Sequence, residues 1–201
     1  MNIPKHLRTA VVSVVWLTLI TGCIFPLLLF ALGRLLYPGQ VSGSLLTRNG
    51  VVVGSRLIGQ DFTRPEYFHS RPSAAGTGYD GTSSGGTNLG PSNPKLIAAV
   101  RRLAEDYRRS NGLPPDAPVP IDAVTSSGSG LDPHISPRNA ELQIARVARA
   151  RGLEEGPVRL LVASHTEGPQ LGFMGSPRIS VLELNLALDQ LVNQAVSLTR
   201  R

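Results

Sequence analysis

Cysteine and aromatic residues are scarce in this sequence, which has one Cys, one Trp, four Tyr and five Phe among 201 residues. A single cysteine excludes a disulfide within the chain and any metal site built from several thiolates. No Gly-x-x-x-x-Gly-Lys-Ser/Thr stretch occurs, so the phosphate loop of independent ATPases is missing. The net charge of +6 comes with few aromatics, and Arg101-Arg102 is typical of a solvated helix face. We therefore expect no nucleic-acid partner, no metal, and no cofactor that the chain binds independently.

Charged residues are absent from the run Thr9–Gly33. As a helix rising about 1.5 Å per residue, this run is about 37 Å long, enough to cross a hydrocarbon core of about 30 Å. A lone segment can satisfy its backbone in lipid only as a helix. We predict a basic tail at residues 1–8 and one transmembrane helix at residues 9–36, with a kink or local break at Pro26.

Two alternatives to a permanent anchor stay open. A cleaved signal peptide also begins with basic residues, but its apolar region is usually only about 7–15 residues long. Residues 20–23, Ile-Thr-Gly-Cys, resemble the lipobox of bacterial lipoproteins, in which Cys23 would carry lipid. Residues 24–32 nevertheless remain apolar, where a lipoprotein turns polar after its cysteine. A spanning helix therefore agrees best with the sequence.

The distribution of basic residues bears on the orientation of that helix. Lys5 and Arg8 lie in the short tail before the run, whereas Arg34, Arg48 and Arg56 follow it. Long domains translocate largely regardless of their own charge, so the short basic tail has more weight in setting the orientation of the helix. We expect a single-pass protein of the cell inner membrane, with its N-terminus in the cytoplasm and its C-terminal domain in the periplasm or outside.

Residues 37–201 are long enough for one domain with its own core. Asn93-Pro94 and Ser136-Pro137 are typical helix starts, and these two helices are predicted to end at Gly112 and Gly152. Further helices are expected from Pro157 and over 186–198, a strand pair over 50–59, an extended piece over 119–125 and a strand over 179–185. Because helices and strands are mixed without βαβ alternation, the fold class is a single N-terminal transmembrane helix followed by one α+β domain.

The stretch from Gln60 to Pro94 is rich in Gly, Ser, Thr, Asn and Pro and shows little apolar periodicity. Such composition is often a flexible linker. Tyr67, Phe68 and Tyr79 are interleaved in it, however, and a linker has no need of them. We predict Gly/Ser/Asn-rich loops that form an ordered, irregular surface.

Several long motifs stand out in the chain, namely Gly59-Gln-Asp-Phe, Tyr67-Phe-His-Ser-Arg-Pro-Ser-Ala, Tyr79-Asp80, residues 84–94, Val119-Pro-Ile-Asp, residues 125–137 and residues 181–188. Together they resemble the KdpC family, the C subunit of the bacterial Kdp potassium-transporting ATPase, and the resemblance extends from the apolar run to about Asp189. Thr87 stands where that family is expected to have serine.

The resemblance implies a non-catalytic subunit of a four-part pump, whose partners are KdpA with the ion path, the P-type ATPase KdpB, and the small KdpF. The Asp-Lys-Thr-Gly-Thr phosphorylation motif expected of the catalytic chain is not present in this sequence. The family is described as chaperone-like, needed for assembly and raising the ATP affinity of the ATPase subunit. An external domain cannot touch ATP, so that effect would be indirect; in a cytoplasmic domain, ATP could be bound only jointly with KdpB.

We predict a partner or regulatory interface in the segments 67–94 and 125–137. Within it, Arg71 is expected to pair with Asp80 or Asp132. The predicted interface residues are Tyr67, Phe68, Arg71, Pro72, Tyr79, Asp80, Ser84, Gly85, Gly86, Asn88, Asn93, Ser129, Asp132 and His134.

Three other interpretations of these motifs stay open. Ser84-Gly85-Gly86 resembles part of the phosphate-contacting signature of ABC transporters, although a glycine turn explains it as well. Ser129 with Asp132 and His134 would make a membrane-tethered serine hydrolase, but no Gly-x-Ser-x-Gly elbow is present. The histidines are expected to be hydrogen-bonded structural groups rather than metal ligands.

Overall fold

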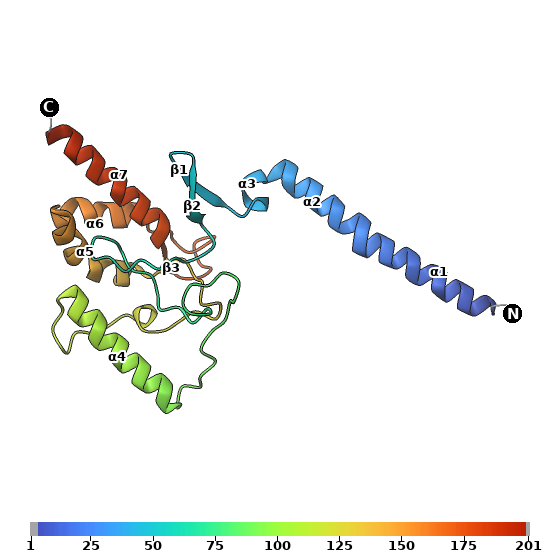
Figure 1. Cartoon of the computed structure of the whole chain (residues 1–201), viewed down its shortest axis with the longest axis horizontal. Coiled ribbons are helices and arrows are strands. Elements are labelled where there is room, and N and C mark those ends of the chain that lie inside the picture. The colour runs from blue at the N-terminus through green and yellow to red at the C-terminus, as the bar shows by residue number, and fades with distance from the viewer. Residues whose placement is uncertain (1–3, 200–201) are drawn as a thin grey trace. The chain divides into compact units, whose positions relative to one another are not determined.

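The computed structural model describes the backbone of residues 4–199 and the side chains of residues 4–193 (Figure 1). The chain forms two compact units whose boundary falls between Leu45 and Leu46. The first three residues of the predicted tail and the last two of the predicted domain lie outside the described residues.

The first unit is dominated by one continuous helix, Lys5–Leu36. It consists of α1 (Lys5–Leu19), a π-helical segment (Ile20–Ile24) and α2 (Phe25–Leu36), and none of these residues is buried. By its length and composition it is long and apolar enough to cross a membrane. The predicted apolar helix is therefore confirmed, and it begins at Lys5 rather than at residue 9. The short helix α3 (Pro38–Val41) follows it.

The local break predicted at Pro26 takes the form of the π-helical segment one turn before it. Proline has no N–H, so it cannot donate to the carbonyl four residues earlier. The preceding helical turn contains one extra residue, and the N–H of Phe25 donates to the carbonyl of Ile20, five residues earlier. Such single π turns are a usual way for a helix to accommodate a proline or an insertion.

A hairpin of β1 (Leu45–Arg48) and β2 (Val51–Ser55) begins at the boundary and, except for Leu45, belongs to the second unit. Asn49 and Gly50 both have positive φ, 52° and 78°, as a two-residue type I′ turn requires. The prediction of a strand pair over 50–59 was therefore wrong in position, because its first strand comes before the turn. Arg48 pairs with Asp189 at 2.5 Å and fastens the hairpin to the last helix.

Two helices of this unit begin and end where their capping residues predict. The side chain of Asn93 accepts from the backbone of Lys95 at the start of α4 (Pro94–Asn111), which ends at Gly112. Ser136 caps α5 (Pro137–Arg151) in the same way, and Gly152 ends it. Both glycines have φ 65°, the left-handed conformation that closes a helix with little strain for glycine.

The remaining elements are α6 (Glu155–Ser164), α7 (Val181–Thr199), a 3₁₀ turn (Ile121–Ala123), and the strands β3 (His134–Ile135) and β4 (Ile179–Ser180). The two strands pair antiparallel, with Ile135 opposite Ile179. The predicted strand over 179–185 was wrong beyond Ser180, because Leu184 and Leu188 share one helix face and are both fully buried. The extended piece predicted over 119–125 was also wrong, since its centre is the 3₁₀ turn.

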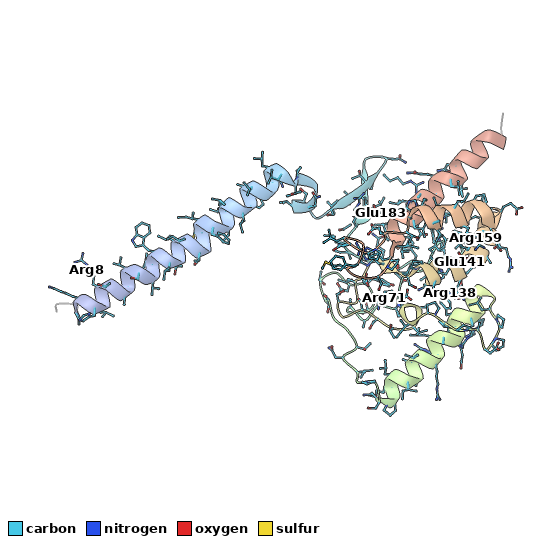
Figure 2. All side chains as sticks on the ribbon, turned by 180° about the vertical axis from the view of Figure 1, so that it is seen from behind. Arg8, Arg71, Arg138, Glu141, Arg159 and Glu183 are labelled. Atoms are coloured by element: carbon cyan, nitrogen blue, oxygen red, sulfur yellow. The ribbon has the colours of Figure 1, made fainter. Side chains whose placement is uncertain are left out.

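The core of the second unit lies among its helices. Helix α5 packs against α4 and α6, and α6 packs against α7; Figure 1 shows this succession from α4 (green) to α7 (red). Arg159 of α6 pairs with Glu141 of α5 at the rim; both are labelled in Figure 2. The fully buried centre includes Phe68 from the stretch between β2 and α4, and Ile144, Val147, Val158 and Leu188 from the helices. The mixture of helices and short strands confirms the α+β class.

Candidate functional site

The irregular segment, residues 56–93, contains no helix or strand, yet two amide side chains hold it against the helices. Asn185 of α7 accepts from the backbone N–H of Phe68 at 2.8 Å and donates to its carbonyl at 2.9 Å. Gln143 of α5 does the same for His69, at 2.7 and 3.2 Å. Each amide takes the place of a neighbouring strand, so the buried backbone stays satisfied without a sheet.

Arg146 fixes the turn that leads into this part of the segment. Its guanidinium donates to the carbonyls of Pro65 and Tyr67 at 2.6 and 2.9 Å, and to the side chains of Asn111 and Gln143 at 2.9 and 2.6 Å. Burial lowers the pKa of Arg146 to about 10, although it stays charged near neutral pH. The planar fork of arginine is suited to four acceptors on different elements.

The paired loops, residues 71–86 and 127–134, are held together by side-chain and backbone bonds. Nη1 of Arg71 donates to Oδ2 of Asp132 at 2.7 Å, which confirms one of the two predicted partners. The Ser73 hydroxyl donates to the carbonyl of Gly130 at 2.7 Å. The N–H of Gly85 donates to the carbonyl of Ser129 at 2.9 Å. The other predicted partner, Asp80, instead accepts from the backbone and hydroxyl of Thr82.

The paired loops approach so closely that one position admits no side chain. Gly130 has φ 68°, and a Cβ there would lie 2.6 Å from both the nitrogen of Ala75 and the carbonyl oxygen of Gly85. Backbone packs on backbone at this point, so the glycine is required for both its conformation and its size.

Asp132 is the charged centre of the paired loops. Its second oxygen accepts from the backbone and from Nδ1 of His134, at 3.0 and 3.1 Å. Burial opposes ionisation of this carboxyl, but the hydrogen bonds from His134 and the charge of Arg71 outweigh it, so the pKa of Asp132 is lowered. Asp132 therefore stays an anion that bridges Arg71 and His134.

The geometry gives no support to the hydrolase alternative. Oγ of Ser129 accepts from the N–H of Leu131 at 3.1 Å and lies 3.3 Å from Oγ of Ser127. Among the described side chains, no hydrogen bond joins Ser129 to His134. The Asp132–His134 pair thus lacks the nucleophile that a triad needs.

The Ser84-Gly85-Gly86 stretch forms no turn of its own and is bonded instead to the facing loop. Ser84 donates its hydroxyl to the carbonyl of Ser129 at 3.0 Å, and the Gly85 amide is bonded to the same carbonyl. A phosphate would need amides that are free to donate. The contacts therefore give no support to the phosphate interpretation, and the predicted glycine turn is not formed at these residues either.

The other predicted residues fall into different environments. Phe68 is fully buried in the core, and Asn93 serves as the cap of α4. Tyr79 has φ 55°, its hydroxyl donates to the carbonyl of Arg71, and burial raises its pKa to about 12. Asn88 is exposed with φ 51°. Of the predicted set, the structure thus joins Arg71, Tyr79, Ser84, Gly85, Ser129, Asp132 and His134 in or beside the paired loops.

The surroundings of Tyr67 were not predicted from the sequence. Two guanidinium groups lie over its ring, with Cζ of Arg151 at 4.7 Å and Cζ of Arg64 at 5.0 Å from the ring centroid. Arg151 forms an ion pair with Asp189 at 2.8 Å, and the Tyr67 hydroxyl lies 3.5 Å from the same carboxylate. These residues come from distant parts of the chain, and no local pattern joins them.

A cavity of about 420 Å³ lies between α4 and the irregular segment. Its lining includes His69, Tyr79 and Tyr107, and the Tyr107 hydroxyl donates to Oδ1 of Asn139 at 2.9 Å. Burial raises the pKa of Tyr107; burial and the charge of Arg146 lower that of His69. Among the described residues, no group of His, Cys, Asp and Glu could hold a metal ion.

Comparison with known proteins identifies relatives over nearly the whole chain. The family model for KdpC, described as "K+-transporting ATPase, c chain", matches residues 7–190. The potassium-transporting ATPase KdpC subunit of Koribacter versatilis (strain Ellin345) is 53% identical over 188 residues, which cover 92% of this chain and 94% of that protein. The protein of the same name from Mycobacterium tuberculosis (strain ATCC 25618 / H37Rv) is 50% identical over 187 residues, 93% of this chain and 99% of the relative. That from Sorangium cellulosum (strain So ce56) is 53% identical over 187 residues, 92% and 97% of the two chains.

Proposed function

The chain belongs to the KdpC family, the c chain of K+-transporting ATPases, and we propose that it acts as a non-catalytic, membrane-anchored subunit in assembly of the pump. One observation carries this proposal. The chain matches the family over residues 7–190, and this range includes nearly all of an apolar helix with no buried residue in the chain itself. Such a helix needs lipid or other membrane helices to cover it.

The proposed orientation places the N-terminus in the cytoplasm of a bacterial inner membrane and the α+β domain on the opposite side. It is supported by Lys5 and Arg8, which lie at or near the beginning of the helix, because short basic segments are retained in the cytoplasm. In this orientation the domain faces the side from which potassium enters the cell.

A non-catalytic role is supported by what the sequence and the paired loops contain. The sequence has neither the phosphate-loop pattern nor the Asp-Lys-Thr-Gly-Thr motif. The cluster of Ser129, Asp132 and His134 that could suggest hydrolysis has its serine bonded to a backbone amide instead of to His134. ATP hydrolysis is then the task of KdpB.

The proposed partners are KdpA, KdpB and KdpF, and the proposed contact surface is the exposed side of the paired loops. Pre-ordered loops lose little conformational freedom when a partner binds, which favours affinity. Arg71 and Asp132 supply that order. A rise in the ATP affinity of KdpB would be indirect, transmitted through the complex as a coupling free energy between two sites.

Co-expression with the other three subunits tests this function. We expect the full chain to co-purify with them in a fixed ratio and to be required for potassium-stimulated ATP hydrolysis. The purified chain alone is expected to hydrolyse neither ATP nor a generic ester, and Ser129→Ala should leave activity of the complex unchanged. Full potassium-stimulated activity in a complex that lacks the chain would contradict the proposal.

A further inference from the structure

The loop between α6 and β4 presents three apolar side chains to solvent. We call these residues, Leu171, Phe173 and Met174, the apolar tip; their exposed fractions are 82%, 78% and 50%. Large apolar side chains are normally scattered on a surface, whereas a group of three within four residues marks an interaction site. Methionine and phenylalanine are also enriched where proteins meet.

The apolar tip is braced from its base upwards. Glu167 and Arg178 exchange backbone hydrogen bonds of 2.9 and 3.0 Å, and their side chains form an ion pair at 2.9 Å. Further along, Gln170 and Met174 exchange two backbone bonds of 2.8 Å. These antiparallel bridges fix the direction in which the tip points. A pre-organised tip loses little freedom on insertion into a shaped pocket.

Leu171 adopts a conformation that leucine rarely takes. Its φ is 52°, in the left-handed region that favours glycine, and Gly172 follows with φ 82°. The strained leucine is among the most exposed apolar side chains of the domain. Backbone hydrogen bonds from Gly172 to Pro169 and from Phe173 to Gln170 hold this conformation within the loop. They do not need an exposed leucine side chain, whereas contact with a partner would use one.

The charges around the apolar tip argue against a lipid surface as its occupant. Residues 168–177 carry no charged side chain, and Arg178 at the base is already paired with Glu167. Loops that anchor at anionic lipid headgroups gain affinity from unpaired lysine and arginine, and interfacial anchors favour Trp and Tyr. The tip has none of these. A neutral, apolar pocket on a protein complements it better.

The base of the apolar tip is continuous with the paired loops. Pro177 and Arg178 line a cavity of about 270 Å³ together with Arg71, Asp132 and His134. The chain then enters β4, which pairs with β3 at His134–Ile135. A partner seated on the paired loops would therefore lie within reach of the tip. We propose that the apolar tip inserts into an apolar pocket on another subunit of the potassium-transporting complex, an inference that rests on the proposed function.

The test uses the full chain, co-expressed with the other subunits and purified in detergent. For L171S/F173S we expect affinity for the rest of the complex to fall about a hundredfold, because apolar anchors buried in a pocket dominate binding. A matched control, L57S/L160S, replaces two leucines elsewhere that are 64% and 74% exposed, and we expect wild-type assembly. Leu171→Gly removes the side chain while keeping the left-handed backbone, and should also weaken assembly.

Folding and contact are then separated by two further measurements. Hydrogen exchange of the core helices should be unchanged in L171S/F173S, which excludes loss of the fold. A photo-crosslinking amino acid in place of Phe173 should form an adduct with another subunit of the complex. Adducts only with lipid, or only with a second copy of this chain, would overturn the inference. So would wild-type assembly of L171S/F173S, which would leave the proposed function standing. Failure of the wild-type chain to assemble would overturn both.

Discussion

Arg71 and Asp132, 61 positions apart in the chain, are joined by a hydrogen bond of 2.7 Å from Nη1 to Oδ2. Their side chains are 23% and 28% exposed, so water screens the pair only in part. The bond ties the irregular segment to the loop before β3. The order of the paired loops, and with it the proposed contact surface, depends on this relationship.

Replacement of Arg71 by methionine should destabilise the domain by about 1–3 kcal/mol, because a half-buried carboxylate loses a charged donor. Urea unfolding of the full chain in detergent, followed by near-ultraviolet circular dichroism, measures the change. Arg109→Met is the control: Arg109 pairs with Asp106 on an exposed helix face, so its loss should cost less than about 0.5 kcal/mol.

A double-mutant cycle with R71M and D132N isolates the pair from its surroundings. We expect a coupling energy of about 1 kcal/mol or more between the two positions. Additive effects would show that the ion pair does not stabilise the paired loops.

Asn185→Ala should cost about 2–4 kcal/mol, because it leaves both buried backbone groups of Phe68 without a partner. The same urea experiment measures the loss. Asn193→Ala, on an exposed turn of the same helix, should change stability by less than about 0.5 kcal/mol. Equal effects of the two variants would rule out the strand-like role of Asn185.

Gly130→Ala should destabilise the domain by about 2–4 kcal/mol, because the new Cβ would meet the backbone of Ala75 and Gly85 at a positive φ. Gly128→Ala is the matched control two residues earlier, where a Cβ meets nothing within 4 Å and φ is not positive. Protease resistance of the full chain distinguishes the two. A stable Gly130→Ala protein would contradict the close approach of the paired loops.

Stability should fall as pH drops through the range where His69 titrates. Burial and the charge of Arg146 lower the pKa of His69 below its ordinary 6.5, and they outweigh the opposing effects of the hydrogen bond with the Arg64 carbonyl and the charge of Asp61. The unfolded chain then binds a proton on His69 more tightly than the folded chain does. The stability that neutral His69 contributes to the folded state is therefore complete above pH 6.5 and is lost as pH falls toward the lowered pKa. His69→Gln should reduce the drop in melting temperature between about pH 7.5 and pH 5. An unchanged drop in melting temperature would show that groups other than His69 cause the pH dependence of stability.

Cys23 should carry no lipid, and the helix that contains it should remain attached to the domain. Intact mass spectrometry of the membrane-extracted chain tests both expectations at once. A lipid adduct on Cys23 would favour the lipoprotein alternative, and a chain that begins beyond the apolar run would favour signal cleavage.

The parts of the fold that sequence analysis predicted correctly are those set by neighbouring residues. Asn93, Gly112, Ser136 and Gly152 act through their own turn of helix, so the ends of α4 and α5 follow from local chemistry. The apolar helix of the first unit is predictable from the length of the uncharged run alone. The apolar residues just after Ser180 are too few to distinguish the period of a strand from that of a helix. The burial of both Leu184 and Leu188 shows that this part of the chain is a helix.

The candidate site was predictable only in part, because its bonds join distant segments. Arg71 could be given two possible partners from its charge, and the structure selects Asp132. The amide bridge between Asn185 and Phe68 spans 117 positions and has no sequence signal. The exposure of Leu171 and Phe173 could not be foreseen either, since alternation of apolar residues usually predicts a buried face.

Potassium-stimulated ATP hydrolysis by complexes purified with and without this chain tests the central claim most directly. We predict that the anchored, full-length chain co-purifies in a fixed ratio, that activity collapses without it, and that adding it back restores activity. A mature chain found free in solution without residues 1–36, together with a fully active complex that lacks it, would contradict the account.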